Sequence, residues 1–139
     1  MKITSKSRIA IKSLIILGLE SKRLSVREIA EAEDLSVRYL EQVISSLKKN
    51  HLVDSLKGAN GGYALAKSAD QITVFDIVTA IEGNQGFSEE ATSTMEKVLD
   101  DFVFSPLDYH LEEKLKSVKL IELIEEFRSK TNSEYMYYI

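Results

Sequence analysis

The fold is decided by residues 25–66, SVREIAEAEDLSVRYLEQVISSLKKNHLVDSLKGANGGYALA. Ser25 and Glu28 have the spacing of a capping box, in which each side chain binds a backbone N–H group at a helix start. Ser36 is a second N-cap, and the apolar residues at 39, 40, 43, 44 and 47 then repeat at helical spacing. Two short capped helices joined by a few residues predict a helix-turn-helix.

A glycine-rich hairpin follows these two helices. Residues 52–56 and 63–66 have the composition of short strands and flank Lys57-Gly58-Ala59-Asn60-Gly61-Gly62. Glycines let a hairpin tip adopt positive φ and bring backbone N–H groups close to a sugar–phosphate chain. At this distance behind a helix-turn-helix, the hairpin is predicted to be a wing, with Tyr63 bracing it from below.

Further helices are predicted on both sides of this segment. Residues 9–19 are apolar on most faces, which indicates a buried helix. Residues 72–83 predict a helix capped by Thr73 and stopped by Gly83. A shorter helix is expected over residues 119–127, followed by a polar segment and an apolar end.

An apolar stripe at helical spacing begins near Glu89 and extends to Val118. The only proline, Pro106, lies within it, so the stripe forms either one long kinked helix or two helices, the second capped by Ser105. The unbroken stripe favours one long helix.

The expected fold class is mainly α with a small β-hairpin wing. A winged helix-turn-helix DNA-binding domain is assigned to residues 1–83, further helices to 84–127, and a C-terminal tail to 128–139.

The charge of the chain is divided between its two halves. Residues 1–67 contain 12 Lys/Arg and 7 Asp/Glu, a net charge of +5, whereas residues 68–139 contain 6 and 15, a net charge of −9. A basic half suits a polyanionic partner such as DNA. No export signal and no long apolar run are visible, so we expect a cytoplasmic protein without a membrane segment.

Cysteine is absent. This excludes disulfides, thiolate nucleophiles and the usual ligands of iron–sulfur clusters, and two histidines make a poor zinc site. His51 lies at a predicted helix end and His110 on the long helix, where an interface role suits it better than a ligand role. No catalytic set, metal site or cofactor is therefore predicted, and an enzyme is not expected.

The residues expected to meet DNA lie at the start of the second short helix, on the wing and at basic positions nearby. Arg38 can pair bidentately with guanine and Gln42 with adenine, whereas Glu41 either accepts from cytosine or forms an ion pair within the protein. Lys12, Lys22 and Arg23 are interpreted as solvated. The full predicted set is Lys6, Arg8, Ser36, Val37, Arg38, Tyr39, Glu41, Gln42, Lys48, Lys49, Lys57, Asn60 and Gly61.

The chain resembles the Rrf family of bacterial winged-helix regulators over nearly its whole length. The resemblance is carried by MKITSK at 1–6, SVRYLEQV at 36–43, LVDSLKGANGGYAL at 52–65 and ITVFDIV at 72–78. It implies a homodimer that binds a palindromic operator in double-stranded DNA. Ser36, Arg38, Tyr39, Glu41 and Lys57 match positions that contact DNA in relatives.

The resemblance also implies that residues 84–127 form dimerisation helices and that the long C-terminal helix builds the dimer. The residues it assigns to the interface are Met95, Val98, Leu99, Phe102, Val103, Leu107, Leu111 and Leu115. Two departures matter. Lys57 stands where the wing commonly carries arginine, and the three cysteines that hold a cluster in many members are missing between residues 83 and 106, which excludes cluster sensing.

The end of the chain is similar to that of a cysteine-free branch of the family that represses genes of cysteine metabolism. This tail comprises Tyr135, Met136, Tyr137, Tyr138 and Ile139. The similarity implies that cysteine synthase binds the terminal isoleucine and modulates repression. From composition alone, the tail could instead pack as an apolar plug on its own dimer helix.

Two other functions remain open at this point. One is a regulator of the same fold that senses a metabolite in the loop between Gly83 and the long helix. The other is a protein-interaction adaptor whose winged helix no longer meets DNA.

Overall fold

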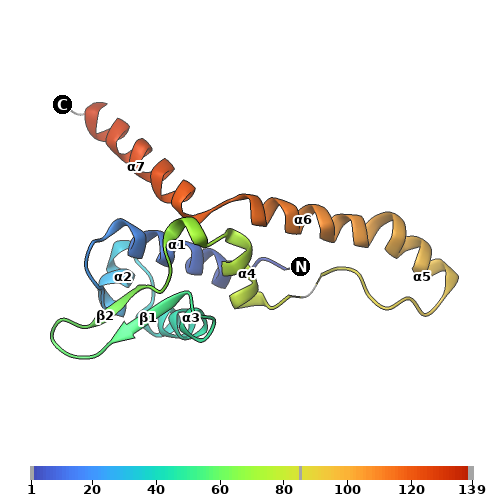
Figure 1. Cartoon of the computed structure of the whole chain (residues 1–139), viewed down its shortest axis with the longest axis horizontal. Helices are drawn as coiled ribbons and strands as arrows, with labels where there is room; N and C mark the ends of the chain where they lie inside the picture. The colour runs from blue at the N-terminus through green and yellow to red at the C-terminus, as the bar shows by residue number, and fades with distance from the viewer. Residues whose placement is uncertain (1, 85, 138–139) are drawn as a thin grey trace.

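The computed structural model describes the backbone of residues 2–84 and 86–137, and the side chains of this range up to residue 132. Figure 1 shows a body of helices with a hairpin, from which the helix of residues 94–117 extends on one side and the C-terminal helix on the other. The first part of the chain contains α1 (Ser5–Leu19), α2 (Val26–Ala32), α3 (Val37–Lys49), β1 (Val53–Leu56), β2 (Gly62–Leu65), a 3-10 turn (Ala69–Gln71) and α4 (Val74–Glu82). The second part contains α5 (Thr94–Leu99), a π-helical turn (Asp100–Phe104), α6 (Ser105–Ser117) and α7 (Leu120–Tyr137). The predicted fold class is confirmed.

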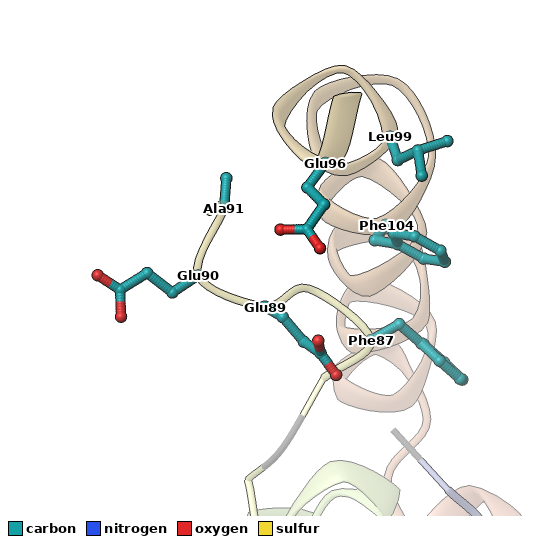
Figure 2. A pocket seen from close by; sticks show the side chains of 7 residues that line it. All are labelled: Phe87, Glu89, Glu90, Ala91, Glu96, Leu99 and Phe104. Atoms are coloured by element: carbon teal, nitrogen blue, oxygen red, sulfur yellow. The ribbon is translucent and has the colours of Figure 1, made fainter. Parts of the chain in front are cut away.

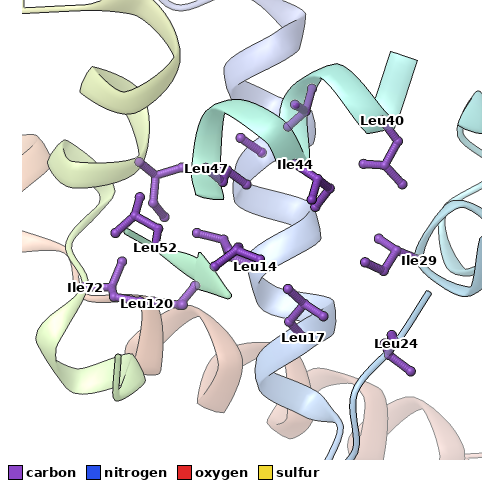
Figure 3. Packing of buried hydrophobic residues seen from close by; sticks show 14 of the residues in the cluster. Leu14, Leu17, Leu24, Ile29, Leu40, Ile44, Leu47, Leu52, Ile72 and Leu120 are labelled. Atoms are coloured by element: carbon purple, nitrogen blue, oxygen red, sulfur yellow. The ribbon is translucent and has the colours of Figure 1, made fainter. Parts of the chain in front are cut away.

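The hydrophobic core is built around α1. Leu14 of α1 is fully buried, and Ile29 of α2 and Leu40 and Ile44 of α3 pack in the same cluster. Figure 3 shows these side chains converging between the helices. Each buried Leu or Ile contributes about 1.5–3 kcal/mol through its removal from water. The core therefore holds the helix-turn-helix in one arrangement.

The helix caps follow the sequence prediction. Ser25 Oγ accepts from the Glu28 N–H group at 3.1 Å, and the Glu28 carboxylate accepts from the Ser25 N–H group at 3.1 Å. Ser36 Oγ caps α3 by accepting from the Tyr39 N–H group at 3.4 Å. Thr73 caps α4 in a second capping box, and Gly83 ends α4 with φ +81°.

The hairpin is held to the body by a third segment. β1 and β2 pair antiparallel, with Val53 opposite Leu65 and Leu56 opposite Gly62. Leu24 adds an isolated bridge to β2: its N–H group donates to the Tyr63 carbonyl at 3.0 Å and its carbonyl accepts from the Tyr63 N–H group at 2.7 Å. At the base of the wing, β2 is thus hydrogen-bonded to β1 and, at one residue, to Leu24.

The long helix runs without a break from Thr94 to Ser117. It begins five residues later than the expected start at Glu89, because Ser93 caps it by accepting from the Glu96 N–H group at 3.1 Å. The continuity expected across Pro106 is confirmed. Just before the proline, the Ser105 N–H group donates to the Asp100 carbonyl in a wider π-type turn. Such a turn accommodates a residue that cannot donate an ordinary helical hydrogen bond.

The predicted end of the last helix at Phe127 is wrong, because α7 continues to Tyr137. The segment after Phe127 is polar but contains neither glycine nor proline, so nothing in it stops a helix. At the other end of α7, Leu120 and Ile124 are buried in the core cluster. Gly18 lies so close to Ile124 that a Cβ atom there would be 2.2 Å from its Cδ1 atom.

The start of α7 is also joined to the start of α4. The Val74 N–H group donates to the Val118 carbonyl at 2.9 Å, and the Leu120 N–H group donates to the Ile72 carbonyl at 2.8 Å. After the long helix, the chain therefore returns to the core of the helix-turn-helix.

Candidate nucleic-acid interface

The first turns of α3 present their polar side chains to solvent. Leu40 is fully buried and anchors the helix. The exposed residues are Ser36, Val37, Arg38, Tyr39, Glu41 and Gln42. Within the described residues, Glu41 forms no ion pair, so its carboxylate is available to a base edge.

The short turn between α2 and α3 sets the angle of the recognition helix. Asp34 has φ +52°, a left-handed conformation that aspartate tolerates better than most residues. The Leu35 N–H group then donates to the Ala30 carbonyl at 2.8 Å. Leu35 packs against the core, so the turn is fixed on its inner side.

The wing tip is shaped by its glycines. Gly58 has φ +105°, and the Gly61 N–H group donates to the Gly58 carbonyl at 3.0 Å. A Cβ atom on Gly61 would lie 2.1 Å from the Leu56 carbonyl oxygen, so only glycine fits there. Lys57 and Asn60 are exposed at this tip. Their position suits contact with a phosphate backbone.

The other predicted basic residues are spread over the surface. Arg8 is exposed and Lys6 half-buried on α1. Lys48 and Lys49 lie in the last turn of α3, about 18 Å along the helix axis from its start by the ordinary rise per residue. They also suit the negative end of the helix dipole. The structure therefore does not place these two lysines beside Arg38.

The prediction that Arg23 is simply solvated is wrong, because its side chain is paired. Its Nη1 atom donates to Asp54 Oδ1 on β1 at 2.6 Å and to the Gly62 carbonyl at 3.3 Å. Asp54 lies 31 positions away in the sequence, so no local pattern could indicate this contact. Lys12 and Lys22 are also paired, with Glu33 at 3.6 Å and Glu28 at 3.9 Å, but on the exposed surface.

The N-terminus of α1 is tied to the end of α4 by Glu82. Its Oε1 atom accepts from the Thr4 N–H group at 3.1 Å, from the Thr4 hydroxyl and from the Ser7 hydroxyl at 2.8 Å. Burial alone would raise the pKa of Glu82, but these hydrogen bonds outweigh burial and lower it. The carboxylate is therefore ionised at neutral pH and fixes the segment that carries Lys2 and Lys6.

The loop after α4 is hydrogen-bonded to the long helix. Asp108 accepts from the Phe87 N–H group at 2.7 Å and from the Ser88 N–H group at 2.9 Å. The Ser88 hydroxyl bonds to Asp100, which also accepts from Ser105 at 2.9 Å. Hydrogen bonds from these two serine hydroxyls hold the pKa of Asp100 below its ordinary value.

A pocket of about 240 Å³ lies between this loop and the long helix. It is lined by Phe87, Glu89, Glu90, Ala91, Glu96, Leu99 and Phe104 (Figure 2). The Glu96 carboxylate already accepts from the Thr92 N–H group at 2.9 Å. Figure 2 shows the Glu90 side chain pointing away from the helix. The acidic lining disfavours an anionic metabolite.

The long helix carries an exposed apolar face. Phe102 is 81% exposed and Met95 72% exposed. The other exposed members of the predicted interface set are Val98, Leu99, Val103 and Leu107. Leu111 and Leu115 are half-buried, because this end of α6 lies against α4, where the Lys116 ammonium group sits 4.8 Å from the centre of the Phe75 ring.

Comparison with known proteins decides the family. Residues 3–126 match the family model described as "Rrf2: Iron-dependent Transcriptional regulator". The chain belongs to the Rrf2 family. The regulator IscR of Sodalis glossinidius is 33% identical over 132 residues, which cover 89% of this chain and 79% of that protein. The Rrf2 relatives are transcriptional regulators rather than enzymes, and the resemblance inferred from the sequence is confirmed.

Solved Rrf2 structures have the same fold. The structure of CymR, "the Global Cysteine Regulator of B. subtilis", is 30% identical with a TM-score of 0.78, and the match covers 91% of this chain and 98% of that one. CymR of Staphylococcus aureus is also 30% identical, with a TM-score of 0.70 and coverage of 88% and 97%. Together these matches establish a DNA-binding regulator with a winged helix.

This Rrf2 chain does not fit an iron–sulfur cluster, although the family description mentions iron. It contains no cysteine. In the part of the chain that the structure describes, no three His, Cys, Asp or Glu side chains are grouped so that they could hold a metal ion. In the same part, no helix is long and apolar enough to cross a membrane.

Proposed function

We propose that this protein is a homodimeric transcriptional repressor that binds a palindromic operator through α3 and the wing. The observation that carries the proposal is the exposed start of α3 beside a glycine-shaped wing. α3 packs against β1, so the two reading elements share one support (Figure 1). The start of a recognition helix reads base edges in the major groove, whereas a flexible glycine tip approaches phosphate.

The dimer is proposed to form along the exposed apolar face of the long helix. A single copy leaves Met95, Val98, Phe102 and Val103 in water. A contiguous apolar surface of this kind marks an interaction site. A second copy of the same helix offers matching side chains, and a twofold arrangement would present two α3 helices to a palindrome.

Arg38→Ala is expected to weaken binding to the preferred operator by about 1–3 kcal/mol and to relax the base preference at one position in each half-site. Lys57→Ala is expected to weaken binding to all sequences alike. It should also reduce the log–log salt slope by about 0.9 per lost phosphate contact. Fluorescence anisotropy on fragments selected from random DNA, at several salt concentrations, measures both effects.

The matched control for these two variants is Lys130→Ala, which removes an exposed positive charge from α7. It should leave affinity and salt slope unchanged. If neither Arg38→Ala nor Lys57→Ala altered DNA binding, α3 and the wing would not be the reading elements. Absence of any salt-sensitive binding by the unmodified protein would favour an adaptor.

A second, more specific role is proposed in cysteine metabolism, with cysteine synthase as a partner. It is supported by the similarity to CymR, which is described as a cysteine regulator, and by the similar ending of the chain. α7 continues to Tyr137, so Tyr135, Met136 and Tyr137 extend it as a helix whose side chains are not described. Tyr138 and Ile139 lie outside the described residues. A terminal carboxylate beside an aliphatic side chain suits an amino-acid site.

Deletion of Ile139 is expected to abolish binding of cysteine synthase while leaving DNA binding intact. Calorimetric titration of cysteine synthase into the full-length and shortened proteins measures enzyme binding. Anisotropy on operator DNA measures DNA binding. An Ile139→Leu variant, which keeps an aliphatic end and the carboxylate, is the control and should retain most binding. If cysteine synthase bound the shortened protein as tightly as the full-length one, the tail would not be its binding site.

A further inference from the structure

The base of the wing is held by one guanidinium group that reaches across three chain segments. We propose that Arg23 and Asp54 form a clamp that positions the wing for DNA, and that Arg23 acts through Asp54 rather than by touching DNA. This inference rests on the proposed DNA-binding function, and it assigns a role to a residue outside the recognition helix and the wing tip.

The geometry of Arg23 differs from that of the other ion pairs of the basic half. Its Nη1 atom lies 2.6 Å from Asp54 Oδ1 and 3.3 Å from the Gly62 carbonyl oxygen, so one nitrogen joins β1 and β2. The Arg23 side chain is 29% exposed, against 70% for that of Lys22 next to it. The guanidinium is therefore held in one place, whereas the lysine pair is loose and solvated.

The hairpin needs such support because it is small. Each of its strands has four residues, and a two-stranded hairpin alone is marginally stable in water. Leu24 supplies the neighbouring support through two backbone hydrogen bonds to Tyr63. Arg23 precedes Leu24 directly, so the side-chain clamp and the backbone bridge come from the same chain segment and both act on the base of the hairpin. The wing tip with Lys57 and Asn60 projects from this base.

The charge of Asp54 makes the inference testable. A carboxylate beside a DNA-binding surface repels phosphate, so its removal should ordinarily strengthen DNA binding. If Asp54 instead holds Arg23 and the wing, its removal loosens the wing. The wing must then be ordered when the protein binds DNA, which lowers the affinity. The two interpretations therefore predict opposite signs for the same substitution.

The decisive experiment measures operator affinity and salt slope for Asp54→Ala and Arg23→Ala. Each is expected to weaken binding about three- to tenfold with the salt slope unchanged, because no phosphate contact is lost. The double variant Arg23→Asp with Asp54→Arg should recover most of the loss, since it restores the pair with reversed charges. Glu31→Ala, which removes a negative charge elsewhere in the basic half, is the control for Asp54 and should bind at least as tightly. Lys22→Ala is the control for Arg23.

Amide hydrogen exchange without DNA tests the clamp independently of the proposed function. The Leu24 and Tyr63 amides, which donate across the bridge, should exchange faster in both single variants than in the unmodified protein. Unchanged exchange would overturn the clamp even if affinity fell. Stronger binding by Asp54→Ala, or a salt slope about 0.9 lower in Arg23→Ala, would assign Arg23 to a direct phosphate contact instead. If the unmodified protein bound no DNA, the proposed function would fail and exchange alone would decide the clamp.

Discussion

Replacement of Phe102 by aspartate is expected to give a monomer that no longer binds its operator specifically. Phe102 is the most exposed large apolar side chain of the long helix. In the proposed dimer, the substitution would bury an unpaired carboxylate from each copy, which costs several kcal/mol. Loss of the second half-site would then weaken operator binding about 10²- to 10⁴-fold.

Sedimentation velocity measures the change in mass, and anisotropy on a palindromic fragment measures the change in affinity. Lys114→Asp introduces an aspartate at an exposed polar position of α6 and should remain dimeric. Helix content and thermal stability of the monomer should be retained, since Phe102 lies outside the core cluster. A Phe102→Asp protein that stayed dimeric would locate the interface on another surface.

Gly62→Ala is expected to destabilise the protein more than Gly58→Ala, although both glycines have positive φ. Both substitutions place alanine in a left-handed conformation, at φ +123° and φ +105°, which costs about 1–3 kcal/mol. Only at Gly62 would the new Cβ atom meet backbone, 2.8 Å from the Leu24 carbonyl oxygen, whereas nothing lies within 4 Å at Gly58. Gly62→Ala should therefore lose about 1–3 kcal/mol more.

Urea unfolding of the two glycine variants measures this difference. Gly62→Ala should also weaken DNA binding at all salt concentrations, because it pushes β2 away from Leu24 and shifts the wing. Equal losses of stability in the two variants would show that the approach of Leu24 to Gly62 does not constrain the wing base.

The elements that could be predicted from the sequence are those specified by residues close together in the chain. Several helix ends are marked by residues that lie within one turn of them, and each of these ends is found where it was predicted. The marking residues are Ser25 with Glu28, Ser36, Thr73 and Gly83. The hairpin follows the same rule, since Gly58 and Gly61 lie between the two strands and Gly62 begins the second.

The features that could not be predicted depend on residues far apart in the sequence or on the absence of a stop signal. Arg23 meets Asp54 only after the hairpin docks on Leu24. Leu120 and Ile124 belong to a predicted separate helix, and only folding brings them into the core cluster, where Ile124 lies beside Gly18. The extension of α7 past Phe127 differs from the prediction because polar composition indicates a tail, although polar residues alone do not end a helix.

The pairing of residues 72–74 with 118–120 has a consequence for the choice of target. It joins the end of the long helix to the winged helix-turn-helix, so the proposed dimer would hold its two DNA-binding surfaces at one separation and one twist. Inserting a single base pair at the centre of an operator moves one half-site by about 3.4 Å and turns it by about 35°. A dimer with this fixed geometry would select its operators by the spacing between half-sites as strictly as by the base sequence of the half-sites.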